Sequence, residues 1–197
     1  MNLKEKFFDL FNLYVEKKIE KKDISRVLKK LLPFQISLNL LRLGEENDGG
    51  YLIPDDFSGI KNCFSAGVGD LTKFEKDLEE KFSINSNMID FNEIDPKILP
   101  ENCKFIKKKI GVISTENEIS INDWLQEKKE EIILKIDIEG DEYISLNSIS
   151  DENLKKVRIL IVELHDLRNL RNYSFFKIFE KILSRLNHYF YICHLHI

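Results

Sequence analysis

The polar residues that most suggest chemistry stand in an otherwise apolar segment, Leu134-Lys-Ile-Asp-Ile-Glu-Gly-Asp-Glu-Tyr143. Asp137 interrupts a run with the composition of a central strand buried on both faces. Carboxylates at this place can hold a ligand or take a proton, because open α/β sheets bind ligands beyond the carboxyl ends of their strands. Glu139, Asp141 and Glu142 have a second explanation, since a helix dipole favours acidic residues in its first turn. We therefore expect Asp137 above all to be functional.

A second segment, Ile161-Val-Glu-Leu-His-Asp166, also ends an apolar run with polar residues. His165 has the pKa range of a general base that could take a proton from a hydroxyl. Together with Asp137 and Glu139 it could instead bind a hard divalent cation, which prefers oxygen ligands; we favour a metal-free site. A purely structural histidine is an open alternative. Glu163 and His165 share one strand face only if the strand continues that far.

A third segment, Cys63-Phe-Ser-Ala-Gly-Val-Gly-Asp70, is a short apolar run that enters a Gly-x-Gly turn. Glycine lets the backbone turn tightly and approach a ligand, and a following helix would present free N–H groups to that ligand. The third glycine of the dinucleotide-binding fingerprint is absent, which disfavours a nicotinamide cofactor. A plain connection between strand and helix is the alternative. If the strands of Gly67 and Asp137 flank the point where strand order reverses, both motifs face one crevice.

The elements that would position these residues alternate along the chain. From residue 61 onward, short apolar runs are interleaved with helical segments, which is typical of βαβ units and of a mainly parallel sheet with helices on both faces. We expect strands at 62–66, 87–91, 104–112, 131–138, 158–164 and 189–196, a short strand at 51–53, and helices at 72–82, 121–128 and 174–186. The sequence therefore predicts an α/β fold in one compact domain.

The composition is that of an ordinary globular protein. Of 197 residues, 43% are hydrophobic and 32% charged, which predicts a packed core and argues against a disordered or membrane protein. The net charge is −4 and the lysines are spread along the chain, so there is no basic stripe of the kind that binds nucleic acid. Three widely spaced cysteines without a CxxC pair indicate neither a disulfide framework nor a zinc site. We expect a protein of the reducing cytoplasm.

Residues 1–40 are expected to form a helical extension of the main domain at 41–197. Apolar residues recur at helical spacing over 3–17 and again over 22–32, where Asp23 is a plausible N-cap. The first of these segments is charged throughout and lacks the apolar run of a signal peptide. No stretch approaches the ~18 apolar residues of a membrane span. We therefore expect two leading helices and no transmembrane segment.

Five segments together resemble the FkbM-type methyltransferases. They are RLGEENDGGYLIP at 42–54, FSAGVGDLTKFEKDL at 64–78, INDWL at 121–125, LKIDIEGDEY at 134–143 and IVELHDL at 161–167. Their order and spacing agree with that family, and LKIDIEG is the most specific piece. The resemblance implies a Rossmann-like class I methyltransferase fold with S-adenosylmethionine as methyl donor. It also implies a small-molecule or glycan acceptor, methylated on a hydroxyl oxygen in glycan or polysaccharide biosynthesis.

The resemblance also implies roles for individual residues. Gly67 and Gly69 would lie against the amino-acid part of the cofactor, and the turn around Asp48 would help to close the same pocket. Asp137 and Glu139 would stand where cofactor and acceptor meet, with His165 facing the acceptor. The implied cofactor-binding residues are Asp48, Gly49, Gly50, Gly67, Gly69, Asp70, Asn92 and Asp137, and the implied catalytic residues are Asp137, Glu139 and His165.

The sequence departs from the family pattern in two places. The second strand of the fold generally ends in an acidic residue that binds the ribose hydroxyls, but Asn92 stands there, with Asp90 and Glu93 as alternatives. Relatives also continue beyond the final His-x-His strand, whereas this chain stops at Ile197. A truncated C-terminal strand would leave an open sheet edge, which could pair with another copy of the chain.

Two other functions are alternatives, and the first of them is motivated by the truncated strand. A truncated, non-catalytic methyltransferase-like domain could act by binding a partner through the open edge, and it would not need to bind the cofactor. An NAD-dependent oxidoreductase on the same architecture is disfavoured by the incomplete glycine pattern.

Overall fold

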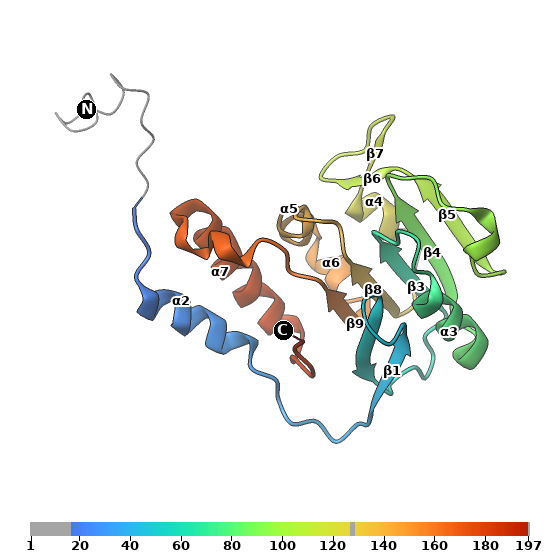
Figure 1. Cartoon of the computed structure of the whole chain (residues 1–197), viewed down its shortest axis with the longest axis horizontal. Helices are drawn as coiled ribbons and strands as arrows, with labels where there is room; N and C mark the ends of the chain where they lie inside the picture. Colours follow the sequence, from blue (N-terminus) through green and yellow to red (C-terminus); the bar gives the residue numbers. More distant parts are fainter. Residues whose placement is uncertain (1–16, 127–128, 197) are drawn as a thin grey trace.

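The computed structural model of the chain describes residues 17–126 and 129–196. Its centre is a five-stranded sheet in the order β5-β4-β3-β8-β9, with every neighbouring pair parallel (Figure 1). The strands are β3 (Asn62–Ala66), β4 (Asn85–Asp90), β5 (Cys103–Lys107), β8 (Ile132–Ile136) and β9 (Val157–Val162). This arrangement is the Rossmann-like α/β fold that the sequence predicts.

Strand order reverses between β3 and β8. The chain moves outward from β3 through β4 to β5, and then returns to place β8 on the other side of β3. In register, Ala66 pairs with Ile136, so the Gly67 turn and Asp137 leave the sheet side by side. The predicted reversal at these two strands is therefore confirmed, and a crevice for ligands is expected there.

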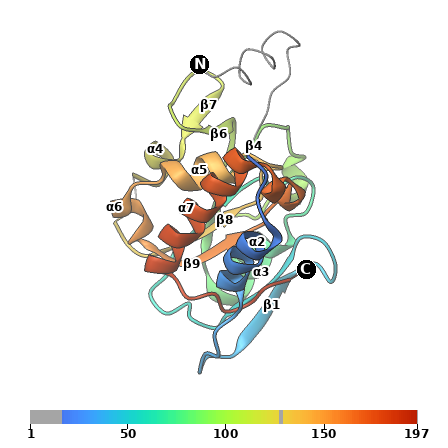
Figure 2. The same cartoon turned by 90° about the vertical axis from the view of Figure 1, so that its left-hand side faces the viewer.

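Helices cover both faces of the sheet, because successive strand residues point to opposite sides. Cys63 and Ile133 face helix α3 (Lys73–Phe82), while their neighbours Phe64 and Leu134 face the opposite layer. That opposite layer contains α4 (Ile121–Gln126), α5 (Glu142–Ser148), α6 (Asp151–Leu154), α7 (Tyr173–Tyr189) and α2 (Lys21–Leu28). Figure 2 shows α7 crossing in front of the sheet with α2 beside it.

Short elements complete the fold. A hairpin of β1 (Leu40–Gly44) and β2 (Gly50–Pro54) packs on the α3 side, where Leu43 and Ile53 join Phe74 in the core. Two further strands, β6 (Lys109–Gly111) and β7 (Glu118–Ser120), pair with each other. The short 3-10 helices are Lys29–Leu31, Pro96–Ile98 and Leu167–Arg171.

The N-terminal extension is described only from Lys17 onward, so the helix predicted at 3–17 lies almost wholly outside the described residues. The helix predicted at 22–32 is confirmed as α2 and the 3-10 turn after it. Asp23 is not its N-cap, because α2 begins at Lys21 after Glu20 and Asp23 lies in the first turn. It packs on α7, with an ion pair of 2.8 Å between Arg26 and Glu180 and a hydrogen bond of 3.0 Å from Lys30 to Ser184. Val27 is fully buried in the same core as the sheet.

The prediction of a single strand at 104–112 is wrong, because these residues form parts of two strands in different sheets. β5 ends at Lys107, where a tight turn bonds the N–H of Lys108 to the carbonyl of Ile106. β6 then leaves the main sheet to pair with β7. The three lysines at 107–109 stand where the chain leaves the main sheet. The helix predicted at 121–128 is described to Gln126.

The strand predicted at 189–196 is also wrong. Helix α7 continues to Tyr189, and residues 190–196 form no strand. These residues lie beside the segment that follows α2, where the N–H of Phe34 donates to the carbonyl of Ile192 at 2.7 Å and the rings of Phe34 and Tyr191 meet edge to face. Apolar side chains of this segment, including Phe190, pack against the helical layer instead of extending the sheet. Among the described residues, β9 pairs only with β8 and is therefore an edge strand.

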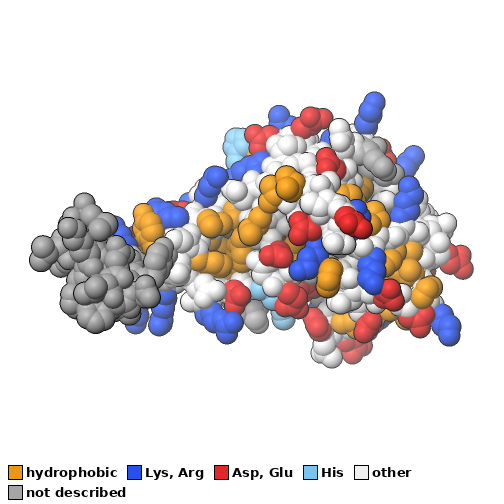
Figure 3. All heavy atoms as spheres, turned by 90° about the horizontal axis from the view of Figure 1, so that it is seen from above, with side chains coloured by type: hydrophobic (Ala, Val, Ile, Leu, Met, Phe, Trp, Pro, Cys, Tyr) orange, Lys and Arg blue, Asp and Glu red, His pale blue; other side chains and the backbone are white. Residues whose placement is uncertain are grey.

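The surface carries mixed charge. Figure 3 shows Asp and Glu interspersed with Lys and Arg on one face, with hydrophobic side chains between them. No helix in the described part of the chain is long and apolar enough to cross a membrane.

Candidate active site

The glycine turn after β3 fits closely against the end of β8. Gly67 has φ +72°, and a Cβ atom on it would lie only 1.5 Å from the backbone oxygen of Asp137. Gly69 has φ +54°, but a Cβ atom there would meet nothing within 4 Å. Both residues need the left-handed backbone that glycine adopts without strain. Gly67 is therefore required by packing, whereas Gly69 faces open space.

The carboxylate of Asp90, at the end of β4, accepts hydrogen bonds from two N–H groups of this turn. Its Oδ2 accepts from Val68 N at 2.9 Å and from Gly69 N at 3.0 Å, and its Oδ1 accepts from Asn92 N at 2.7 Å. In dinucleotide-binding proteins such turn N–H groups approach a pyrophosphate. A phosphate here would meet a buried carboxylate instead, so the turn suits a ligand without a phosphate.

A cavity of about 470 Å³ lies where the turns after β3, β4 and β8 meet the β1–β2 hairpin. Most of the sequence-predicted site residues line it: Asp48, Gly49, Gly67, Gly69, Asp70, Asn92, Asp137 and Glu139. Gly49 lies against Leu71 of the glycine turn, which brings the hairpin loop to the cavity.

Two predicted residues do not line this cavity. Gly50 begins β2, and a Cβ atom on it would lie 1.9 Å from the backbone oxygen of Glu45, so its place is inside the hairpin. His165 lies next to the cavity-lining Asp137 but is not itself part of the wall.

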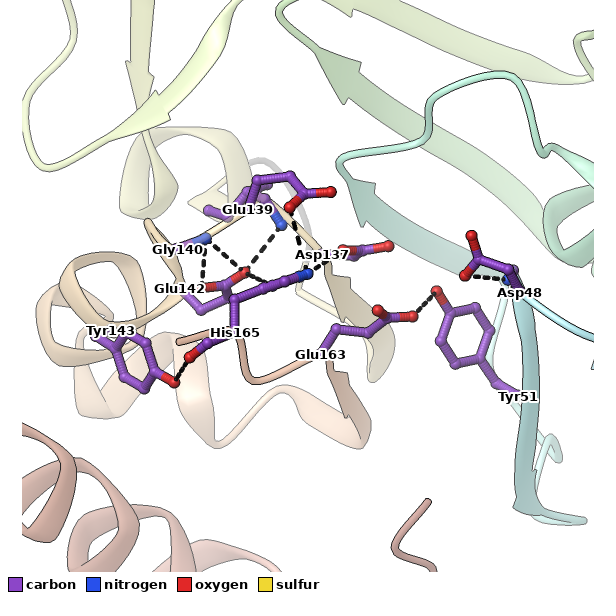
Figure 4. A network of polar contacts seen from close by, with 11 residues as sticks. Asp48, Tyr51, Asp137, Glu139, Gly140, Glu142, Tyr143, Glu163 and His165 are labelled. Atoms are coloured by element: carbon purple, nitrogen blue, oxygen red, sulfur yellow. Dashed lines mark hydrogen bonds and ion pairs between the residues drawn. The ribbon is translucent and has the colours of Figure 1, made fainter. Parts of the chain in front are cut away.

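Asp137 stands at the junction of the cavity and the polar network drawn in Figure 4. Partial burial and the charge of Glu163 raise the pKa of Asp137 to about 6, while the positive charges of Lys135 and His165 act against this rise. A carboxylate with a pKa near neutrality is suited to hold or exchange a proton.

His165 is held by Glu142, the first residue of α5. Its Nδ1 lies 2.6 Å from Oε1 of Glu142, whose side chain is fully buried. The same carboxylate accepts the N–H of Gly140 at 3.0 Å and that of Ile138 at 3.3 Å. Because a carboxylate only accepts hydrogen bonds, Nδ1 of the neutral ring carries the proton and Nε2 is left as the base.

Nε2 of His165 faces two further carboxylates. Oε2 of Glu139 lies at 3.5 Å and Oδ1 of Asp137 at 3.9 Å. Partial burial disfavours the charged ring, but the hydrogen bond to Glu142 and the three surrounding carboxylates outweigh it, so the pKa of His165 is raised. All three residues predicted to be catalytic, Asp137, Glu139 and His165, therefore lie together.

The same cluster offers ligands for a metal. Asp137, Glu142 and His165 each present one ligand atom, and these atoms lie within 4.8 Å of one another. The oxygens of Glu142 already accept two backbone N–H groups and the ring of His165. A cation bound by all three residues would have to displace these hydrogen bonds.

Glu163 and His165 diverge, because β9 ends at Val162. Glu163 turns toward the hairpin, where its Oε1 accepts the hydroxyl of Tyr51 at 3.0 Å, while His165 turns toward α5 (Figure 4). The condition under which the two would share a strand face is therefore not met.

Sequence reasoning assigned no site role to four residues found here, although it considered Glu142 and Glu163. Glu142, Glu163, Tyr51 and Lys135 all contact or border the predicted residues, and Lys135 lines the cavity. A signal existed for Lys135, which interrupts the same apolar strand as Asp137. Glu142 carried no such signal, because an acidic residue in a first helical turn has a local explanation.

Comparisons with known proteins identify the family of this chain. No curated protein and no solved structure matches the chain. The model of the family described as the methyltransferase FkbM domain matches residues 52–192, which include the glycine turn, Asp137 and His165. The chain therefore belongs to the FkbM methyltransferase family.

Proposed function

We propose that this methyltransferase uses S-adenosylmethionine and methylates a hydroxyl oxygen of a sugar or a related small molecule, in glycan or polysaccharide biosynthesis. The observation that carries the proposal is the cavity between the Gly67 turn and Asp137, next to a histidine base. Neither the cofactor nor the acceptor follows from the fold alone, since one fold hosts many activities.

The cavity suits this cofactor by its chemistry. S-adenosylmethionine has no phosphate and carries positive charges on its ammonium and sulfonium groups. The turn N–H groups of Val68 and Gly69 are already bonded to Asp90, and the carboxylates of Asp48, Asp70 and Asp137 line the wall. Gly67, Gly69 and Gly49 would hold the cofactor, with Asn92 beside its ribose. The bound cofactor supplies an electrophilic methyl group.

The residues of the network have distinct tasks in this proposal. Orienting the acceptor oxygen in line with the methyl group accounts for most of the rate gain. Nε2 of His165 takes the proton of the acceptor hydroxyl, and Glu142 holds the ring so that Nε2 is the free nitrogen. Asp137 and Glu139 stabilise the resulting imidazolium. This mechanism needs no metal, and unchanged activity after chelation with EDTA would distinguish it from the metal-assisted alternative.

Calorimetric titration of the purified chain with S-adenosylmethionine tests the cofactor. We expect binding by the wild type and at least about tenfold weaker binding by Gly69→Leu, whose side chain would enter the cavity. Gly59→Leu is the matched control, because Gly59 has φ +83°, has nothing within 4 Å of an added Cβ atom and lies outside the cavity wall.

Two results would overturn this assignment, and a third would remove the evidence for this cavity. Absence of binding by a folded wild-type chain would favour the non-catalytic, partner-binding domain. Binding of NAD in its place would favour the oxidoreductase. Equal loss of binding in Gly59→Leu and Gly69→Leu would mean that the effect came from the backbone and not from the cavity. Where binding is found, formation of S-adenosylhomocysteine with a panel of neutral sugars and glycosides tests the acceptor.

A further inference from the structure

Lys135 is a buried cation in the central strand. Its side chain is 3% exposed, and its neighbours on β8, Leu134 and Ile136, are fully buried in the core. Removing an ammonium group from water is costly unless the charge is paired and hydrogen-bonded. The fold itself does not require this charge, since an apolar residue would serve a central strand equally well.

The partner of Lys135 is Glu75 of α3. Nζ lies 3.1 Å from Oε1 of Glu75, a fully buried side chain, and Ser65 donates a hydrogen bond of 2.5 Å to the same oxygen. The other oxygen of Glu75, Oε2, has no hydrogen-bond partner within the described part of the chain. A buried ion pair with an unsatisfied oxygen is a poor source of stability, and apolar or neutral replacements of similar size are often as stable.

The position of Lys135 connects it to the candidate site. Asp137 follows two residues later, directly after the end of β8, and both residues line the cavity. The ammonium also lies 5.3 Å from the ring centre of Tyr51, whose hydroxyl donates to Glu163. One buried positive charge thus lines the same cavity as Asp137 and lies close to the ring of Tyr51.

We propose that Lys135, held in place by Glu75, is a positioning residue of the methyl-transfer site, which supplies the counter-charge for Asp137 and supports the ring of Tyr51. The site role rests on the function proposed above, whereas the charge relationship does not. Four groups act on the charge of Asp137: Glu163 and Glu139 favour its neutral form, and Lys135 and His165 favour its ionised form. Without Lys135, only His165 would favour the ionised form of Asp137, whereas burial and the carboxylates of Glu163 and Glu139 would favour the neutral form.

The test replaces the ion pair by a neutral pair of similar size. Lys135→Met alone would leave Glu75 buried and uncompensated, so the informative variant is Lys135→Met with Glu75→Gln, in which the amide oxygen still accepts from Ser65. We expect the melting temperature of this double variant to be unchanged or higher. In ¹³C NMR titrations of the side-chain carboxyl groups, assigned with Asp137→Asn, the midpoint for Asp137 should rise by about one pH unit.

A matched control removes the same two charges elsewhere. Lys107 and Glu93 form an exposed ion pair of 2.7 Å, so Lys107→Met with Glu93→Gln should leave the titration of Asp137 unchanged. Lys135→Arg in the otherwise wild-type chain keeps the positive charge, so the titration midpoint of Asp137 should stay close to the wild-type value.

The outcomes separate this inference from the proposed function. An unchanged Asp137 midpoint in a folded double variant would overturn the inference, as would a large loss of stability, which would make the pair structural. Absence of cofactor binding by the wild-type chain would instead overturn the proposed function, and it would leave the titration result standing.

Discussion

The carboxylate of Glu142 binds both Nδ1 of His165, at 2.6 Å, and the N–H of Gly140, at 3.0 Å. A single buried group therefore fixes the orientation of the candidate base and the loop between β8 and α5. That loop carries Glu139, which adopts a left-handed backbone with φ +55°. The orientation of His165 and the loop that carries Glu139 thus depend on one residue at the start of a helix.

Glu142→Gln should lower the pKa of His165, because the amide keeps a hydrogen-bond acceptor but removes the largest favourable charge on the ring. ¹⁵N-detected titration of the imidazole nitrogens measures this pKa directly, and it also reports which nitrogen carries the proton. Glu139→Gln is the control. Its carboxylate is 86% exposed and 3.5 Å from Nε2, so it should produce a smaller decrease. An equal effect of both substitutions would contradict the special role of Glu142.

Asp137→Asn should stabilise the fold at neutral pH. The pKa of Asp137 is raised from 3.8 to about 6, so the folded state binds more protons than the unfolded state between these values and loses stability as pH rises. The full shift corresponds to roughly 3 kcal/mol, and solvent screening at this partly exposed site reduces the expected gain to about 1–2 kcal/mol.

Chemical denaturation at pH 7 and pH 4 measures this gain, which should nearly disappear at pH 4, where Asp137 is largely protonated in the wild-type fold. Asp48→Asn is the control on the same cavity wall. A gain that persists at acid pH would show that it does not arise from the charge of Asp137.

Gly67→Ala should destabilise the fold by about 3 kcal/mol or more, because its Cβ atom would overlap the backbone oxygen of Asp137. Gly69 also has a positive φ, but the space around an added Cβ atom is open. Gly69→Ala should therefore lower the free energy of unfolding by only about 1 kcal/mol. Urea denaturation of the two variants tests the difference. Equal losses would mean that backbone strain alone, and not the contact of β3 with β8, accounts for the effect.

Tyr51 and Glu163 should be energetically coupled, since their hydrogen bond of 3.0 Å joins the hairpin to the end of β9. A double-mutant cycle with Tyr51→Phe and Glu163→Leu, which removes the acceptor, should give a coupling free energy of about 1–2 kcal/mol, as expected for a hydrogen bond to a carboxylate. Tyr51→Phe keeps the aromatic ring over Lys135, so the cycle isolates the hydroxyl group. Simple additivity of the two substitutions would contradict the contact.

The local elements near the site were predictable because their signals are local. The strand at 62–66 agrees with β3, and the glycine turn that follows it needs residues that adopt positive φ. The apolar run that contains Asp137 predicted a central strand, and β8 is buried along its whole length. By contrast, the strand expected at 104–112 ran across the three lysines at 107–109, where the chain turns, and the apolar residues at 189–196 suit a helical surface as well as a sheet.

The sequence by itself determined the α/β class and the strand ends that carry Gly67, Asp137 and His165, because hydrophobic periodicity and turn chemistry act over a few neighbouring residues. The family was indicated separately, by the resemblance of five sequence motifs. Only the tertiary structure decided that Asp90 takes the N–H groups of the glycine turn, that Glu142 holds His165, and that Lys135 pairs with Glu75. These partners stand 21, 23 and 60 residues apart. A contact over such a distance depends on strand order and helix placement, which no short stretch of sequence specifies.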